Sequence, residues 1–319
     1  MDDIRFLDFE KDYLELKTKL DELKDMAVSK NIDMEDEIRG LEARVADFKA
    51  EKYQGLTAWQ KYQMARHPDR PTTLDYIQAL FEDFIELHGD RCFGDDPAVV
   101  GGLAWLEEMP VTIIGHQKGK DTKQNLERNF GCPSPEGFRK ACRLMKQAEK
   151  FGRPLITFVD TQGAYPGVEA EERGQGWAIA QNLLLMSSLQ VPTVSVIIGE
   201  GGSGGALALG VADRVLMLSY SVYAVISPQG CASILYRDAR RANEVAEHLK
   251  MTAPELKALG LIDEVISEPL EGAHRDQEST YREVKARLLF NLRELKNQDV
   301  GELVEQRYER LRKIGIFNE

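Results

Sequence analysis

The sequence predicts an α/β fold in which a largely parallel sheet is covered by helices on both faces. From residue 98 onward, short runs of β-branched residues alternate with longer stretches of helical composition, which is typical of parallel strands joined by right-handed helical crossovers. Three glycine-rich loops follow directly after such runs. We divide the chain into an N-terminal helical extension (residues 1–60), a core (61–275) and a C-terminal helical segment (276–319).

The first 55 residues are predicted to form two helices that pair as an antiparallel hairpin. They include 26 charged residues, no proline and only two glycines. Apolar residues recur every three or four positions from Phe9 to Ala27 and again from Ile38 to Phe48, and a break is predicted at 29–33. Each helix has one narrow apolar stripe, which we expect to pack on the core of this chain or on a partner.

The core is predicted to open with a β-hairpin formed by residues 98–106 and 111–116, around a turn that contains Pro110. Further strands are expected at 155–159, 193–198, 214–218, 222–226 and 262–266. The intervening helices are expected at 135–151, 169–189, 203–212, 229–236 and 253–259. Beyond residue 276, one more amphipathic helix is predicted from the spacing of Val284, Leu288, Leu292 and Leu295.

Composition and charge exclude several classes of protein. The 319 residues are 43% hydrophobic, enough for one large domain with an extension or for two domains. Acidic residues outnumber basic residues by 53 to 41, which argues against a protein that coats nucleic acid or an anionic membrane. No run approaches about 18 apolar residues and no signal-peptide pattern opens the chain, so we expect a soluble cytoplasmic protein.

The four cysteines predict neither a disulfide framework nor a metal site. They form no CxxC motif and have no histidine at zinc-binding spacing. We expect reduced thiols at Cys92, Cys132, Cys142 and Cys231.

The three glycine-rich loops, at 160–167, 199–205 and 227–232, are predicted to build the functional site, because ligands bind at the carboxyl ends of parallel strands. The middle loop has five glycines in seven residues and leads directly into a helical stretch. Its backbone N–H groups are therefore predicted to receive an anion or oxyanion. The alternative is that the glycines only permit close packing or a turn with positive φ.

Two generic motifs overlap in the middle loop. Residues 199–204 match the dinucleotide-binding pattern, but the next strand is not followed by the acidic residue that would hold a ribose. Residues 201–205 match the nucleophile elbow of serine hydrolases, with His248 and His274 downstream. A serine hydrolase that uses Ser203 therefore stays open, although Ser203 is more simply explained as a helix N-cap.

A basic cluster follows the strand at 111–116. In a chain with a net charge of −12, it is the local exception that a phosphate-bearing ligand would need. The alternative is a solvated basic surface. We predict substrate-binding roles for its members, which are Lys118, Lys120, Lys123, Arg128 and Arg139.

Several segments closely resemble the carboxyltransferase alpha-subunit family of bacterial acetyl-CoA carboxylases, and the likeness covers nearly the whole chain. Two positions depart from the pattern of that family: Gln162 stands where proline is usual and Gln229 where glutamate is usual. The resembling segments are RHPDRP (66–71), GHQKG (115–119), DTQGAYPG (160–167), EERGQ (171–175), GEGGSGGA (199–206) and SPQGCASIL (227–235), together with the N-terminal helices.

The resemblance implies a crotonase-type fold, a spiral of ββα units. It also implies transfer of a carboxyl group from carboxybiotin, on a biotin carboxyl carrier protein, to acetyl-CoA, which forms malonyl-CoA for fatty acid biosynthesis. The implied partners are a zinc-finger beta subunit, in an α2β2 complex, and the biotin carboxylase of the full ATP-dependent enzyme. No metal is expected on this chain, and a non-catalytic CoA-binding scaffold subunit remains an alternative.

The reaction implied by the resemblance develops negative charge on the biotin ureido oxygen and on the thioester oxygen, and each oxyanion needs two N–H donors. Gly204 and Gly205 are predicted to supply the pair that faces biotin, while the beta subunit supplies the other. Gly163 and Gly230 are further candidate donors, and Tyr165 is predicted to bind substrate with the basic cluster, which would meet the phosphates of CoA. Since the freed ureido nitrogen can take the methyl proton, no side-chain base is expected.

Overall fold

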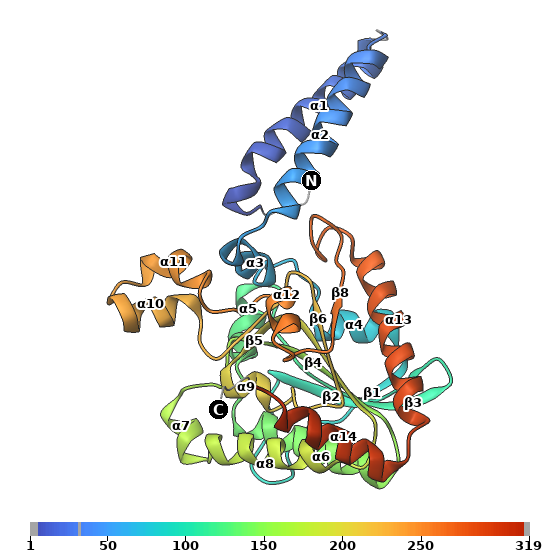
Figure 1. Ribbon diagram of the computed structural model, residues 1–319, viewed down its shortest axis with the longest axis vertical. Helices are drawn as coiled ribbons and strands as arrows, with labels where there is room; N and C mark the ends of the chain where they lie inside the picture. Colours follow the sequence, from blue (N-terminus) through green and yellow to red (C-terminus); the bar gives the residue numbers. More distant parts are fainter. Residues whose placement is uncertain (1–5, 31–32, 316–319) are drawn as a thin grey trace.

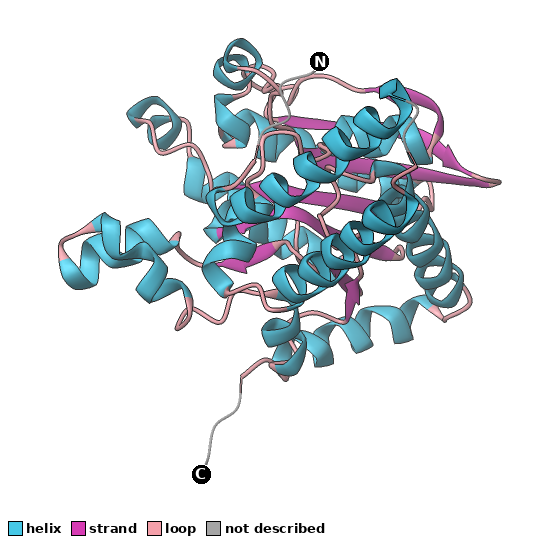
Figure 2. Ribbon diagram, turned by 90° about the horizontal axis from the view of Figure 1, so that it is seen from above, coloured by secondary structure: helices cyan, strands magenta, loops and turns pink. Residues whose placement is uncertain are grey.

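The computed structural model describes residues 6–30 and 33–315 and has one eight-stranded sheet with helices on both faces (Figures 1 and 2). The strand order is β1-β2-β3-β4-β5-β6-β8, and β7 pairs with the far end of β5. β2 is antiparallel to β1 and β3, and every other pairing is parallel. The strands are β1 (Glu82–Glu86), β2 (Val99–Leu106), β3 (Met109–His116), β4 (Leu155–Thr161), β5 (Thr193–Gly202), β6 (Arg214–Leu218), β7 (Val222–Ala224) and β8 (Glu264–Ile266).

From β3 onward helices separate successive strands, as the sequence predicts, except between β6 and β7, which follow one another directly. They are η1 (Asp8–Glu10), α1 (Lys11–Lys30), α2 (Glu35–Gln54), α3 (Ala58–Ala65), α4 (Thr73–Leu80), α5 (Thr122–Glu127), η2 (Asn129–Gly131), α6 (Pro135–Lys150), α7 (Val168–Glu172), α8 (Gln175–Ser188), α9 (Ser203–Leu207), α10 (Pro228–Tyr236), η3 (Ala239–Arg241), α11 (Ala242–Ala246), α12 (Ala253–Ala258), α13 (Gln277–Lys296) and α14 (Val300–Arg312).

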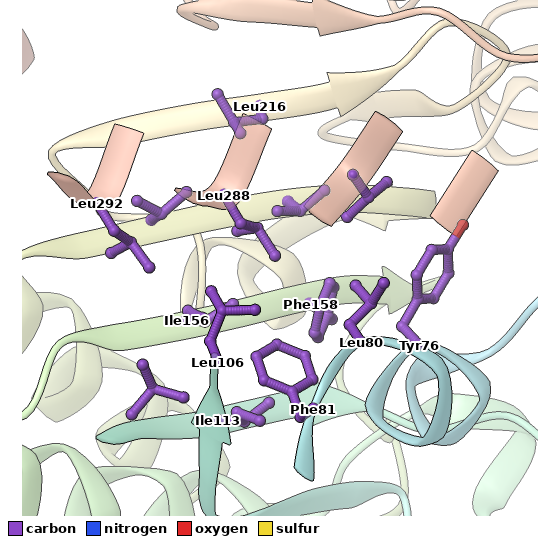
Figure 3. Close-up of a cluster of buried hydrophobic side chains, with 14 of the residues drawn as sticks. Tyr76, Leu80, Phe81, Leu106, Ile113, Ile156, Phe158, Leu216, Leu288 and Leu292 are labelled. Atoms are coloured by element: carbon purple, nitrogen blue, oxygen red, sulfur yellow. The ribbon is translucent and has the colours of Figure 1, made fainter. Parts of the chain in front are cut away.

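The central strands are apolar on both faces, because each face is covered by helices. Ile156 and Phe158 of β4 pack in one cluster with α4 and α13, which Figure 3 shows around Leu288. Leu155 and Val159 of the same strand pack on the opposite side, in a cluster with α6 and α8. This alternation explains why the strand reads as an unbroken hydrophobic run in the sequence.

The N-terminal hairpin of α1 and α2 projects from the rest of the molecule (Figure 1). Its base is held by buried tyrosines: Tyr53 donates to Glu10 at 2.6 Å and Tyr13 donates to Glu271 at 2.8 Å. The predicted break at 29–33 includes residues 31–32, which lie outside the described residues, as do 1–5 and 316–319 of the predicted terminal segments. α1 continues to Lys30, one residue beyond the predicted start of the break.

Several predicted boundaries differ from the structure for local reasons. The helix predicted at 169–189 is divided into α7 and α8, because Gly174 adopts a left-handed conformation (φ 81°) between them. The single C-terminal helix is divided into α13 and α14, where Asp299 caps the second by accepting from the N–H of Gly301. The helix predicted at 203–212 ends at Leu207, and β1 was missed because only Ile85 and Phe84 mark it as apolar.

No helix within residues 6–30 and 33–315 is both long enough and apolar enough to cross a lipid bilayer. The predicted domain boundaries fall inside α3 and immediately before α13.

Candidate active site

The first two glycine-rich loops meet where β4 and β5 end. A Cβ atom added at Gly205 would lie 2.6 Å from the backbone nitrogen of Ala164, and one added at Gly202 would overlap the carbonyl oxygen of Gln162. The third loop follows β7, which pairs with the last residues of β5. All three loops therefore open at one end of the sheet.

Close packing accounts for most glycines of the middle loop. An added Cβ would collide with the Asp160 carboxylate at Gly199 and would lie 2.6 Å from the Tyr223 ring at Gly201. Together with Gly202 and Gly205, these positions have no room for a side chain. Gly204 differs, because the nearest atom to its added Cβ is Cγ2 of Ile179 at 3.7 Å, an ordinary contact distance.

The four predicted oxyanion donors fall into two groups. Gly204 and Gly205 lie in the first turn of α9, where N–H groups have no acceptor four residues earlier in the helix. In contrast, Gly163 donates its N–H to the Thr161 hydroxyl and Gly230 donates to the Ser227 hydroxyl, each at 3.1 Å. The N–H groups of Gly163 and Gly230 are therefore already engaged by hydroxyls of their own loops, whereas those at 204–205 lie at the start of a helix.

A network of buried charges connects the ends of β3, β4 and β5. The Lys118 ammonium donates to Asp160 at 2.7 Å and to Glu200 at 3.0 Å, and Arg66 donates to the other oxygen of Glu200 at 2.9 Å. The Glu200 N–H donates to Asp160 at 2.9 Å. Burial alone would lower the pKa of Lys118, but the two carboxylates hold it above its usual value, so the ammonium stays charged.

A cavity of 270 Å³ opens beside this network, between the segment that follows α3 and the loop that follows β3. Lys118, Lys120 and Arg66 contribute to its lining. Arg70 also lines it, but its guanidinium is buried and donates to Glu268 at 2.7 and 2.8 Å. The cavity is therefore lined by cations that already have carboxylate partners.

The structure brings together only part of the predicted basic cluster. Lys118 and Lys120 line the same cavity, where Lys120 is paired with Asp75 at 2.5 Å. Lys123 lies exposed on α5. Arg128 donates to the Pro97 carbonyl at 2.6 Å.

The remaining two predicted substrate-binding residues lie outside the cavity lining. Arg139, on α6, forms ion pairs with Asp90 and Glu136, each at 2.7 Å. Tyr165 is half-buried, and its backbone N–H donates to the Pro133 carbonyl at 2.9 Å.

Sequence reasoning missed the contributions of Tyr62 and Arg66. Tyr62 is buried on α3, and Arg66 follows that helix and reaches Gln162 after β4 and Glu200 near the end of β5. Neither residue lies near a glycine motif in the sequence, so no motif assigns either of them to the site, although Arg66 begins a segment that resembles the family. Asp160 and Glu200 could have been found, since each is an acidic residue at the end of a buried apolar strand.

The arrangement around Ser203 does not resemble a hydrolase site. Ser203 is exposed, whereas His274, one of the two candidate bases, is buried and stacked on His67. The N-cap of α9 is Gly202, so the prediction that Ser203 caps this helix is wrong by one residue. Ser203 instead begins the helix with φ 51°, a conformation imposed by the tight turn after β5.

No group of three His, Cys, Asp or Glu side chains that could hold a metal ion occurs in the described part of the chain.

A family model described as acetyl co-enzyme A carboxylase carboxyltransferase-like matches residues 6–315. The acetyl-coenzyme A carboxylase carboxyl transferase subunit alpha of Listeria monocytogenes serotype 4b is 55% identical over 312 residues, which cover 98% of each chain. The protein of the same name from Geobacillus kaustophilus is 57% identical over 309 residues, which cover 97% of this chain and 95% of that one.

Two solved structures share the fold. Transcarboxylase 12S, with methylmalonyl-coenzyme A and methylmalonic acid bound, matches with a TM-score of 0.55 and 22% identity over 71% of this chain and 44% of its own. A Pseudomonas malonate decarboxylase hetero-tetramer in complex with coenzyme A matches with a TM-score of 0.55 and 19% identity, over 69% of this chain and 90% of its own. These likenesses confirm the crotonase-type fold that the sequence predicts.

Proposed function

The chain belongs to the carboxyltransferase alpha-subunit family of acetyl-CoA carboxylase, and from this premise we propose that its Gly204–Gly205 turn stabilises the oxyanion formed when biotin gives up its carboxyl group. The members of this family are carboxyl transferase subunits that act within a multi-subunit enzyme. The observation that carries the proposal is the pair of N–H groups in the first turn of α9, one of which belongs to Gly204, where an added Cβ would meet Ile179 only at an ordinary contact distance of 3.7 Å.

The proposed reaction places little demand on side chains. Carboxybiotin, delivered on a separate carrier protein, supplies the carboxyl group, and its freed ureido nitrogen takes the proton that the methyl carbon of acetyl-CoA loses as the new carbon–carbon bond forms. This chain contributes two preorganised N–H donors to the ureido oxygen as its charge develops. The packing of Gly202 and Gly205 against the loop after β4 fixes the direction of these donors.

We further propose that a zinc-finger beta subunit covers the apolar surface beside this turn, in an α2β2 complex that supplies the thioester oxyanion hole. Val168 on α7 and Trp177 and Leu184 on α8 are each more than 70% exposed. These helices lie at the same end of the molecule as α9 (Figure 1), and a Cβ atom added at Gly204 would lie 3.7 Å from Cγ2 of Ile179 on α8. Large apolar side chains gathered beside a reaction site are typical of a subunit interface.

We propose that the basic residues near the cavity bind the phosphates of acetyl-CoA and malonyl-CoA. Lys123 is exposed, and Lys120 keeps more than half of its side chain in solvent although it is paired with Asp75. The biotin carboxyl carrier protein and biotin carboxylase complete the proposed enzyme. We propose the cytoplasm as its compartment, since the four cysteines are all free thiols.

The test is to copurify the chain with its beta subunit and to measure malonyl-CoA decarboxylation with biocytin as carboxyl acceptor. We expect turnover by the complex and none by either subunit alone, because each subunit provides one of two oxyanion holes. Turnover by the alpha chain alone would contradict the proposal, and an inactive complex that binds CoA would favour a scaffold role.

A further inference from the structure

We propose that Tyr62 and Arg66 act as a positioning clamp that holds all three glycine-rich loops in register for carboxyl transfer. This inference rests on the proposed function and assigns a role to the segment between the N-terminal hairpin and the core. We call these two residues the α3 clamp.

The two residues of the α3 clamp together contact one side chain in each of the three loops. Arg66 donates to Glu200 of the middle loop at 2.9 Å, and both of its terminal nitrogens lie 3.4 Å from the side-chain oxygen of Gln162 in the first loop. Arg66 also donates to the Tyr62 hydroxyl at 2.8 Å. That hydroxyl in turn donates to the side chain of Gln229, in the third loop, at 3.0 Å.

The Tyr62 hydroxyl is the link between the second and third loops, since it accepts from Arg66 and donates to Gln229 at once. Burial raises the pKa of this hydroxyl, so it keeps the proton that it donates. Burial alone would lower the pKa of Arg66, but the Glu200 carboxylate holds it above its usual value. Both members therefore keep one protonation state throughout the working pH range.

Stability alone does not explain such a cluster. A buried ion pair contributes little net stability, because desolvation of its charges offsets their attraction. Arg66 keeps 36% of its side chain exposed toward the cavity, whereas the Glu200 side chain is 7% exposed. Apolar residues in place of such an entire ion pair are often neutral or stabilising, so we infer that the cluster is retained for the geometry it imposes.

The clamp can act on the oxyanion donors because the loops are in direct contact. Gln162, which faces Arg66, has its backbone against Gly202, and the neighbouring Gly163 and Ala164 lie against Gly205. A shift of Gln162 or Glu200 would therefore move the turn that carries the 204–205 N–H groups. A displacement of about 1 Å can lower a rate about 100-fold, because reaction geometry must be held closely.

The experiment uses the complex with the beta subunit and four variants. Tyr62→Phe removes the linking hydroxyl and leaves the ring that stacks on Trp59. Gln229→Leu removes its acceptor, whereas Gln229→Glu keeps an acceptor oxygen. Arg66→Ala is assayed with and without added guanidinium. The matched control is Tyr220→Phe, which removes a buried tyrosine hydroxyl that donates to the Leu270 carbonyl at 3.0 Å, away from the clamp.

We expect Tyr62→Phe and Gln229→Leu to lower kcat between about 10- and 100-fold, with the KM for malonyl-CoA and for biocytin changed less than about twofold, because the clamp does not touch substrate. Gln229→Glu should retain at least about tenfold more kcat than Gln229→Leu, and guanidinium should restore activity to Arg66→Ala. The control should match the unsubstituted complex.

Unchanged kcat in Tyr62→Phe and Gln229→Leu would overturn the clamp, and so would a rise in KM at constant kcat, which would indicate substrate contact. If Arg66→Ala fails to assemble, the other variants decide the question, since each removes a single contact. An unsubstituted complex with no activity would instead contradict the proposed function, so the two failures are distinguishable.

Discussion

The Lys118 ammonium donates a hydrogen bond to Asp160 across 2.7 Å, and the pair lies among the strand ends, where the two side chains are only 18% and 8% exposed. Glu200 accepts a second hydrogen bond from the same ammonium at 3.0 Å. A lysine expected to meet a phosphate is thus held by two carboxylates inside the site. Lys118 therefore differs from the exposed Lys120 and from the exposed Lys123 on α5, and the three lysines should respond differently to replacement.

Replacement of Lys118 by alanine should destabilise the folded chain. It leaves Asp160 and Glu200 buried without their cation, and removal of one partner from a buried pair typically costs about 3–5 kcal/mol. Urea unfolding of Lys118→Ala, with the exposed Lys123→Ala as control, measures the difference. Equal unfolding free energies for the two variants would show that the network contributes nothing.

Replacement of Lys120 and Lys123 together should weaken acetyl-CoA binding without slowing the chemical step. Contacts to remote phosphates act about equally in the ground and transition states, and each exposed contact is limited to roughly 1 kcal/mol, or about fivefold. Steady-state kinetics at low and high salt should show a raised KM for acetyl-CoA at low salt only. An acetyl-CoA KM unaffected at low salt would assign this surface to another ligand.

Alanine should be tolerated at Gly204 but not at Gly205. The added methyl lies 3.7 Å from Ile179 in the first case and 2.6 Å from the Ala164 backbone in the second. We expect Gly204→Ala to keep the melting temperature of the original chain and Gly205→Ala to lower it, since backbone atoms cannot move aside as a side chain can. Thermal unfolding of both variants is the measurement, and the reverse order would contradict the packing of the two loops.

Titration of Asp96 should lower the free energy of unfolding as the pH rises from 4 to 6. Burial raises its pKa to about 6, although its carboxylate accepts from the N–H groups of Ala98 and Ser134. The folded state therefore holds a proton that the unfolded state releases near pH 4, so this residue stabilises the fold below pH 4 and loses that contribution as pH rises through 6. Urea unfolding measured from pH 4 to pH 7 should show that the original chain loses up to about 3 kcal/mol of unfolding free energy relative to the Asp96→Asn variant. A difference that stays constant with pH would refute this assignment.

The sequence alone predicts the sheet and the meeting of the loops, because strand periodicity and parallel topology bring all the glycine-rich segments to one end. The contacts between those loops could not be predicted from it. In the sequence, Gln162 and Gln229 stand out only as departures from a family pattern. In the structure, the side-chain oxygens of both accept hydrogen bonds from the α3 clamp. Such a relationship joins residues 62, 66, 162 and 229 through tertiary packing, which no local propensity encodes.

The high density of glycines in the middle loop marks the proposed site, but most of these glycines are needed for close packing rather than for exposed N–H groups. Steric contact accounts for Gly199, Gly201, Gly202 and Gly205, whereas no close contact requires a glycine at position 204. A sequence pattern cannot distinguish a glycine that exposes its N–H from one that admits a neighbour, since both lack a side chain.

We propose that the Gly204–Gly205 turn stabilises the biotin oxyanion, and the turnover number of the Gly204→Val complex is the measurement that decides this claim. A branched side chain crowds this turn and displaces the N–H pair, and loss of one oxyanion donor typically lowers kcat between about 100- and 1,000-fold. We expect that loss in malonyl-CoA decarboxylation at saturating biocytin, in a complex that still elutes as the assembled species, while Ser203→Ala retains most activity. Near-normal turnover by an assembled Gly204→Val complex would contradict the claim.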